Sequence, residues 1–259
     1  MNKLTIALIF IVLWFIYSNK YELFYQNKPY FMSKDETISY FKEDRDNYVS
    51  NLSDLDIIAL KSSSKQDYIN KIVTDARDFT DEEKKILIRA CAEADKFLYN
   101  YLSNIIPEIN GKKIADMEWV LSKTEGKWYE AGYPHTRENI IFITTDVIHH
   151  REVARIMIHE KMHVFERLYP EEIEEWLKVT GYKKHSLLKD YPMARSNPDV
   201  NGIVYVNKDG CKTLAEFKNK NPSGIDDANY PCGRDWKHEH PYEHLAYIVD
   251  YMFAGEKFE

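Results

Sequence analysis

A long helical pattern between about Asp146 and Leu168 limits the folds open to this 259-residue chain. Apolar residues recur in the pattern at helical spacing, namely Ala154, Ile158, Met162, Phe165 and Tyr169. Such a stripe predicts a helix that packs one face into a core. Pro170 is expected to stop this helix, because proline cannot continue one. We therefore expect the helix to be anchored in the core, with its other face directed into a cleft.

The same helix carries an HExxH motif, His159-Glu160-Lys161-Met162-His163. Because His159 and His163 are four residues apart, both imidazoles lie on one helical face and can reach one metal ion. Glu160 projects about 100° around the helix from His159, where it can meet a metal-bound water without being a ligand. In a chain of this composition, roughly 0.03 accidental matches to the motif are expected. The motif therefore favours a metal site over a helix with exposed histidines and no metal.

A catalytic zinc ion needs a third protein ligand and an open fourth position for water. The metzincin pattern would place a third histidine at position 169, but this residue is Tyr169, so that pattern is excluded. We predict Glu243 as the third ligand, because it begins a helix from about Pro241 to Phe253 whose apolar residues can pack on the core. An acid in a first helical turn also stabilises the helix dipole without any metal. Three histidines remain open as rival ligands: His240, His244 and the more distant His238.

The chain before the core reads as helical. We expect residues 21–110 to form a helical N-terminal region that precedes a core of residues 111–259. Thr80 and Glu83 form a capping box, which predicts the start of a long helix that ends near Pro107.

Within the core, β-rich runs at Met117–Leu121 and Asn139–Thr145 predict antiparallel strands. From residue 181 to 237 the chain reads as loops, with only Ile203–Val206 predicted to be a strand. The acidic run 171–175 predicts a solvated helical face, and we assign no calcium site to it. These patterns together indicate an α+β fold.

The N-terminus carries an apolar run from Leu4 to Tyr17 that contains no charged residue. A charged start followed by a short apolar run is typical of a secretory signal. Since bulky residues end the run and no small-residue cleavage site follows, we expect residues 1–20 to be an uncleaved, single-pass signal anchor. The catalytic body would then lie on the exported side of a membrane. If residues 1–20 are cleaved instead, the protein is secreted.

Export would allow Cys211 and Cys232 to pair and would make Asn51-Leu52-Ser53 a possible glycosylation site. The net charge of −7 gives no reason to expect nucleic-acid binding, which needs a basic face.

The HExxH helix, followed by a later Pro-Tyr-Glu-x-x-Ala helix at Pro241–Ala246, resembles the gluzincin branch of the zincin metallopeptidases. More narrowly, residues 111–255 are similar to poorly characterised zinc metalloproteinases of large DNA viruses and protists. The resemblance implies a zincin core: a small, twisted, mostly antiparallel sheet, an active-site helix beneath it, and a C-terminal helix with the third ligand. It implies that His159, His163 and Glu243 bind one zinc ion and that Glu160 is the catalytic base. The 79 residues between His163 and Glu243 are more than compact gluzincins have.

The resemblance also implies that an edge strand, here Asn139–Thr145, binds an extended peptide or protein substrate by strand addition; a buried core strand is the alternative. His135 precedes this strand in a loop and is structural or substrate-facing, with the structural role favoured. His149 and His150 are expected to face solvent. The donor that stabilises the oxyanion stays open among five residues: Tyr230, Tyr242, Tyr247, His240 and His244.

The leading interpretation is a membrane-anchored zinc endopeptidase in which zinc activates a water molecule and Glu160 is the general base. One alternative is a non-catalytic zincin-like binding module, which the presence of Glu160 disfavours, since a structural site needs no base. Another is an HExxH hydrolase that acts on a non-peptide amide.

Overall fold

The computed structural model describes residues 28–233 and 235–257. The predicted anchor at residues 4–17 lies outside these ranges. Within them, no helix combines the length and the apolar character that a membrane crossing requires.

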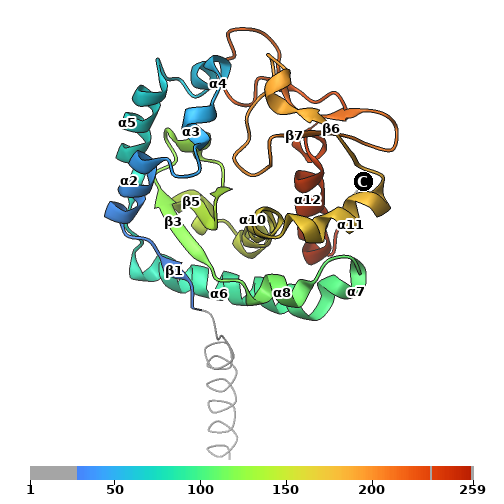
Figure 1. Ribbon diagram of the computed structural model, residues 1–259. Helices are drawn as coiled ribbons and strands as arrows, with labels where there is room; N and C mark the ends of the chain where they lie inside the picture. Colours follow the sequence, from blue (N-terminus) through green and yellow to red (C-terminus); the bar gives the residue numbers. More distant parts are fainter. Residues whose placement is uncertain (1–27, 234, 258–259) are drawn as a thin grey trace, which may run out of the picture.

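The described chain forms a mixed α+β fold around a small sheet (Figure 1). Its strands are β1 (Tyr30–Phe31), β2 (Ala76–Arg77), β3 (Val120–Thr124), β4 (His135–Arg137) and β5 (Ile140–Thr144). The strand order is β1-β3-β5-β4, and β2 also pairs with β3. β3 runs parallel to β1 and β5, whereas β2 and β4 are antiparallel to their neighbours.

This pairing corrects two sequence predictions. The two β-rich runs are not antiparallel, because β4 lies between them in sequence and takes the hairpin position beside β5. Glu138, with φ of 52°, lies in the tight turn of that hairpin. The sheet is therefore mixed rather than mostly antiparallel. β5 is also not an edge strand, since both of its sides are paired, and the edge position belongs to β4 with His135.

The two faces of β5 contact different cores. Ile140 and Phe142 point into one core, while Ile141 and Ile143 point into the other, as the alternation of side chains along a strand requires. Both faces of the strand are thus buried, and this explains its unbroken apolar sequence.

Helices from the N-terminal region cover the face with Phe142. These are α2 (Lys34–Glu43), α3 (Tyr48–Asn51), α4 (Asp54–Ala59) and α5 (Lys65–Asp75). Serine side chains cap three of them by accepting a backbone N–H from the first turn: Ser33, Ser53 and Ser64. Because β1 and β2 also come from this region, residues on both sides of position 111 share one sheet.

The opposite face belongs to the larger core, whose helices are α6 (Asp81–Phe97), α8 (Gly111–Asp116), α10 (Val153–Leu168) and α12 (Pro241–Ala254). α10 packs against β5, and α12 packs on α10 beyond it (Figure 1). The predicted capping box of Thr80 and Glu83 is present at the start of α6. After α6 the chain continues through a π-helical turn, Leu98–Leu102, and α7 (Ser103–Ile105).

The predicted helix 146–168 is divided in two. α9 (Thr145–Ile148) ends before a turn that contains the exposed His149 and His150, and α10 begins at Val153. The apolar stripe begins only at Ala154, so the pattern supports α10 alone. Pro170 ends this helix and also starts α11 (Pro170–Thr180), where proline at the first position is favourable. The acidic run 171–175 lies on α11, and its carboxylates are exposed or half-buried.

Residues 181–237 contain more strand than predicted. β6 (Lys183–Leu187), β7 (Ile203–Val206) and β8 (Lys212–Thr213) form an antiparallel sheet, and β9 (Glu216–Phe217) pairs with β10 (Ala228–Asn229). β6 is mostly exposed and polar, so it lacks the apolar alternation that identifies a strand. Cys211 and Cys232 form a disulfide across this region. Short 3₁₀ turns complete the described chain: Tyr129–Gly132, Leu188–Asp190 and Trp236–His238.

Candidate metal centre

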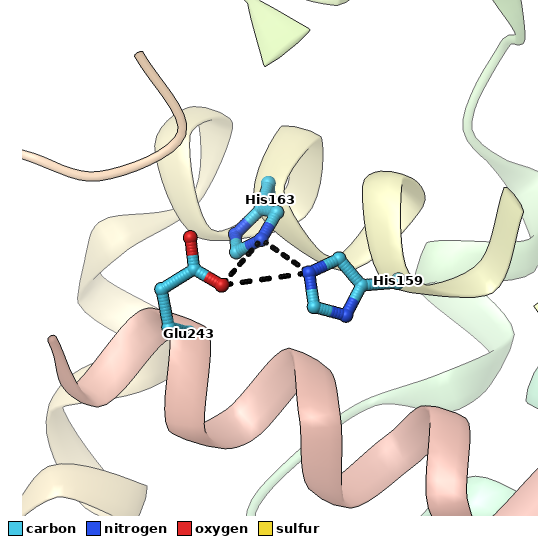
Figure 2. Close-up of side chains that lie close together, drawn as sticks. All are labelled: His159, His163 and Glu243. Atoms are coloured by element: carbon cyan, nitrogen blue, oxygen red, sulfur yellow. Dashed lines mark hydrogen bonds and ion pairs between the residues drawn. The ribbon is translucent and has the colours of Figure 1, made fainter. Parts of the chain in front are cut away.

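Two helices that are distant in sequence build the site. α10 and α12 pack against each other in the larger core, so that side chains from the middle of α10 face the first turns of α12. His240 caps α12 by accepting the backbone N–H of Tyr242, and Pro241 occupies its first position. This start places Glu243 in the first turn, directed at α10 (Figure 2).

Three side-chain atoms converge between these helices. Nε2 of His159 lies 3.0 Å from Nε2 of His163. Oε2 of Glu243 lies 3.5 Å from the first of these nitrogens and 3.6 Å from the second. Figure 2 shows both imidazoles and the carboxylate pointing at a common centre. Among the described residues, this is the group of histidine and acidic side chains that can hold a metal ion.

Each member of the group is oriented by a second residue. Nδ1 of His159 is 3.0 Å from Oδ2 of Asp250, and Nδ1 of His163 is 2.9 Å from Oε2 of Glu166. Because carboxylates accept hydrogen bonds, these contacts place the imidazole hydrogens on Nδ1. Both Nε2 atoms then present lone pairs to the centre.

The carboxylate of Glu243 is fixed in the same manner. Nδ2 of Asn197 donates to its Oε1 over 2.8 Å, which leaves Oε2 for the centre.

Three acceptors within 3.6 Å of one another repel unless a cation lies between them. Four ligands at zinc-like bond lengths of about 2.05 Å in a tetrahedron would be about 3.3 Å apart. The spacing and the chemistry of the three atoms therefore fit a metal ion.

The surroundings favour positive charge at this point. Burial opposes protonation of His159, but the carboxylates of Asp250 and Glu243 outweigh burial and raise its pKa to about 10, so a proton on Nε2 competes with a metal ion for this position. Burial also opposes protonation of His163, but the charge of Glu243 and the hydrogen bond to Glu166 raise its pKa well above the ordinary value. In turn, His163 and His159 hold the pKa of Glu243 well below its ordinary value despite burial.

Glu160 lies outside the converging group but lines the same cleft. Only 4% of Glu160 is exposed, and its Oε2 has no hydrogen-bond partner within the part of the chain that the structure describes. Burial, together with the charge of Asp199, raises its pKa to about 8. The group is thus a buried carboxyl with one oxygen left available.

The cleft itself has a volume of about 400 Å³. His159, Glu160 and Glu243 line it, so the site opens into a space that can admit a ligand. The remaining walls come from the strand β4 and its preceding loop, from loop 195–199, from the first turn of α10, from the second half of α12, and from Ile225 and Trp236.

The rival ligands point elsewhere. Nε2 of His240 lies 3.2 Å from Oδ1 of Asn201, and Nδ1 of His244 lies 3.1 Å from the hydroxyl of Tyr182. Nδ1 of His238 contacts Asp235 at 2.8 Å. The structure therefore brings Glu243, and none of these three histidines, to His159 and His163.

Of the five candidates for an oxyanion donor, Tyr247 is the one that lines the described cleft. Its ring lies 4.5 Å from the ring of His159, nearly edge to face. The other four candidates are not among the described residues that line this cleft: Tyr230, Tyr242, His240 and His244.

Sequence reasoning missed the orienting residues. Glu166 follows His163 by three residues and Asp250 follows Glu243 by seven, so helical spacing places each pair on one face and could have revealed both. Asn197 lies in a loop, and no periodic signal connects it with either helix.

Comparison of this chain with protein-family models, curated proteins and solved structures finds no match.

Proposed function

We propose that this protein is a zinc-dependent endopeptidase with Glu160 as its general base. The observation that carries the proposal is the convergence of His159, His163 and Glu243 beside a buried glutamate at an accessible cleft. A structural metal site closes its fourth position with a protein ligand and needs no base, whereas this one opens into the cleft.

His159 and His163 would hold the ion through Nε2, and Glu243 through Oε2. Zinc bound there would lower the pKa of a coordinated water and polarise a carbonyl group. The two imidazoles are held for this task by Asp250 and Glu166, whose contacts fix the rings and their hydrogens. Two histidines and a carboxylate with one open position are a ligand set of catalytic zinc sites.

Glu160 would accept the proton of the attacking water on its unpartnered Oε2 and deliver it to the leaving amine. Tyr247 would donate a hydrogen bond to the carbonyl oxygen that gains charge. The test of the proposal is peptide hydrolysis by the wild type and by Glu160→Gln, measured with the metal content of both.

The outer contacts lead to a first prediction. Asp250→Asn is expected to weaken zinc binding about 10- to 100-fold, because a neutral amide oxygen accepts the hydrogen on Nδ1 of His159 less strongly than a carboxylate does. Competition with a chromophoric chelator measures this affinity. Asp209→Asn, an exposed position on a turn, is the matched control and should bind zinc as the wild type does. Equal affinity of the Asp250 variant and the control would show that this contact does not orient the ligand.

Strand addition to Asn139–Thr145 is not part of the proposal. Both sides of β5 are paired, and on β4 the backbone N–H of Thr136 already donates to Oδ1 of Asp199 over 2.6 Å. The main chain of a substrate must therefore find other partners in the cleft.

We also propose that residues 4–17 anchor the protein in a membrane and that its body lies on the exported side. The Cys211–Cys232 disulfide supports export, because such bonds persist in oxidising compartments. Protease added outside intact cells that express the protein is expected to digest the body. A body that stays intact until the membrane is permeabilised would contradict export.

A further inference from the structure

Part of the cleft is lined by three side chains that the proposed reaction does not use, namely Glu130, His135 and Asp199. They come from the turn before β4, from β4 itself and from loop 195–199. Each of them is less than 10% exposed. Asp199 accepts hydrogen bonds from Thr136, the neighbour of His135, and the ring of Tyr129, the neighbour of Glu130, contacts the His135 ring, so the three residues lie in one part of the cleft wall.

His135 offers an acceptor that the protein leaves unused. Its Nδ1 lies 2.9 Å from the backbone oxygen of Tyr133, and because a carbonyl can only accept, Nδ1 carries the hydrogen. Nε2 then carries a lone pair. The residue is only 2% exposed, and its Nε2 has no hydrogen-bond partner in the described chain. The ring is held between Tyr129, at 4.4 Å, and Phe142, at 5.2 Å. Buried acceptors are normally paired with a donor, and a ligand in the cleft can supply the donor that the described chain does not.

The two carboxylates beside His135 are held by neutral donors. Oε1 of Glu130 accepts the hydroxyls of Tyr48, at 3.0 Å, and Tyr68, at 2.7 Å. Oδ1 of Asp199 accepts the backbone N–H and the hydroxyl of Thr136. These contacts fix both groups without neutralising them, while Arg167, which contacts the same Thr136 hydroxyl over 3.0 Å, brings one positive charge near Asp199 from outside the cleft lining.

The arginines of the cleft do not cancel the charge of the two carboxylates, because each is paired with another acid. Arg155 contacts Asp250 at 3.0 Å, and Arg195 contacts Glu239 at 2.5 Å. Around His135 the cleft therefore presents two carboxylates and a lone pair, which suit a ligand that brings both positive charge and several hydrogen-bond donors.

We propose that Glu130, His135 and Asp199 form a subsite for the basic side chain, lysine or arginine, of a peptide substrate. The proposal rests on the peptidase function proposed above. An ammonium or guanidinium group supplies N–H donors to Nε2 of His135 and positive charge to both carboxylates. The subsite would set which residue stands next to the cleaved bond and would leave the chemistry of that bond unchanged.

The test compares peptides that differ at one position, scanned on both sides of the cleaved bond. Lysine is compared with norleucine, arginine with citrulline, and glutamate is the opposite charge. At one position, wild-type kcat/KM for the lysine and arginine peptides is expected to exceed that for their neutral counterparts about tenfold or more, and the glutamate peptide should be poorest. This series requires no variant, so it does not depend on the folding of one.

Variants then locate the preference. Glu130→Gln and Asp199→Asn are each expected to reduce the lysine-to-norleucine ratio several-fold, whereas Glu171→Gln, an exposed carboxylate of α11, should leave the ratio unchanged. Cleavage of all peptides without preference for the basic ones would overturn the subsite while the peptidase function stands. So would a preference that the first two variants do not alter.

The absence of any cleavage would instead contradict the peptidase function. The subsite is then tested by calorimetric binding of the lysine and norleucine peptides to the wild type. About tenfold tighter binding of the lysine peptide would support it, and equal affinities would overturn it.

Discussion

Glu160→Gln is expected to lower kcat for peptide hydrolysis about a thousandfold, within the range typical of a lost general base, while the protein keeps its zinc. The substitution preserves the size of the side chain but removes its ability to accept a proton. Metal binding should persist, because Glu160 is not a member of the converging group. Steady-state kinetics on one cleaved peptide measures the loss.

The cleft offers a matched control for this variant. Glu152 also lines it, but this carboxylate is half-exposed and pairs with Arg155 at 3.7 Å. Glu152→Gln should retain kcat near the wild-type value. If the two variants have similar kcat values, Glu160 is not the base, whatever the metal content.

The second large effect is expected at the third ligand. Glu243→Gln should reduce zinc affinity by more than about 100-fold, the upper limit for loss of an outer-shell partner. The amide keeps the shape of the side chain but loses the negative charge opposite two imidazoles 3.5 and 3.6 Å away. Competition with a chromophoric chelator measures the affinity, and circular dichroism verifies the fold.

His244→Gln and His240→Gln test the rival assignments. Both histidines contact other residues, Tyr182 and Asn201. His244→Gln should therefore keep the wild-type zinc affinity, and His240→Gln, which also removes the cap of α12, should lose far less affinity than Glu243→Gln does. Loss of zinc from one of them, with Glu243→Gln unaffected, would transfer the third position to that histidine.

The arrangement of the candidate site followed from local rules to a large extent. The i, i+4 spacing of His159 and His163 determines that both rings share a face, and it does so on any α-helix. Glu243 was found from Pro241 and the apolar residues after it, which indicate where a packed helix begins. Both signals are short-range, so the sequence contains them directly.

The strand arrangement was harder to predict, because it depends on partners distant in the chain. β4 has the sequence His135-Thr136-Arg137, which looks like a polar loop, yet all three residues are buried. Arg137 is tolerated there because Asp44 and Asp46 pair with its guanidinium. Those partners are about 90 residues away, and without β4 the two β-rich runs resemble neighbouring antiparallel strands.

The loop that completes the site shows the same limit. Asn197 donates to Glu243, and Asp199 accepts from Thr136, because hydrogen bonds to several other elements hold the loop in place. Asp56, for example, accepts the backbone N–H of Ser196 over 2.9 Å. Such contacts have no periodicity, and their residue types are common in any loop.

The claim that His159, His163 and Glu243 hold a catalytic zinc ion is tested most directly by one paired measurement. Metal content and cleavage of a peptide library are determined on the same preparations of the wild type and Glu160→Gln. We expect about one zinc per chain in both proteins, with cleavage by the wild type alone. A folded wild-type protein that binds no zinc, or a Glu160→Gln protein that cleaves as the wild type does, would contradict the claim.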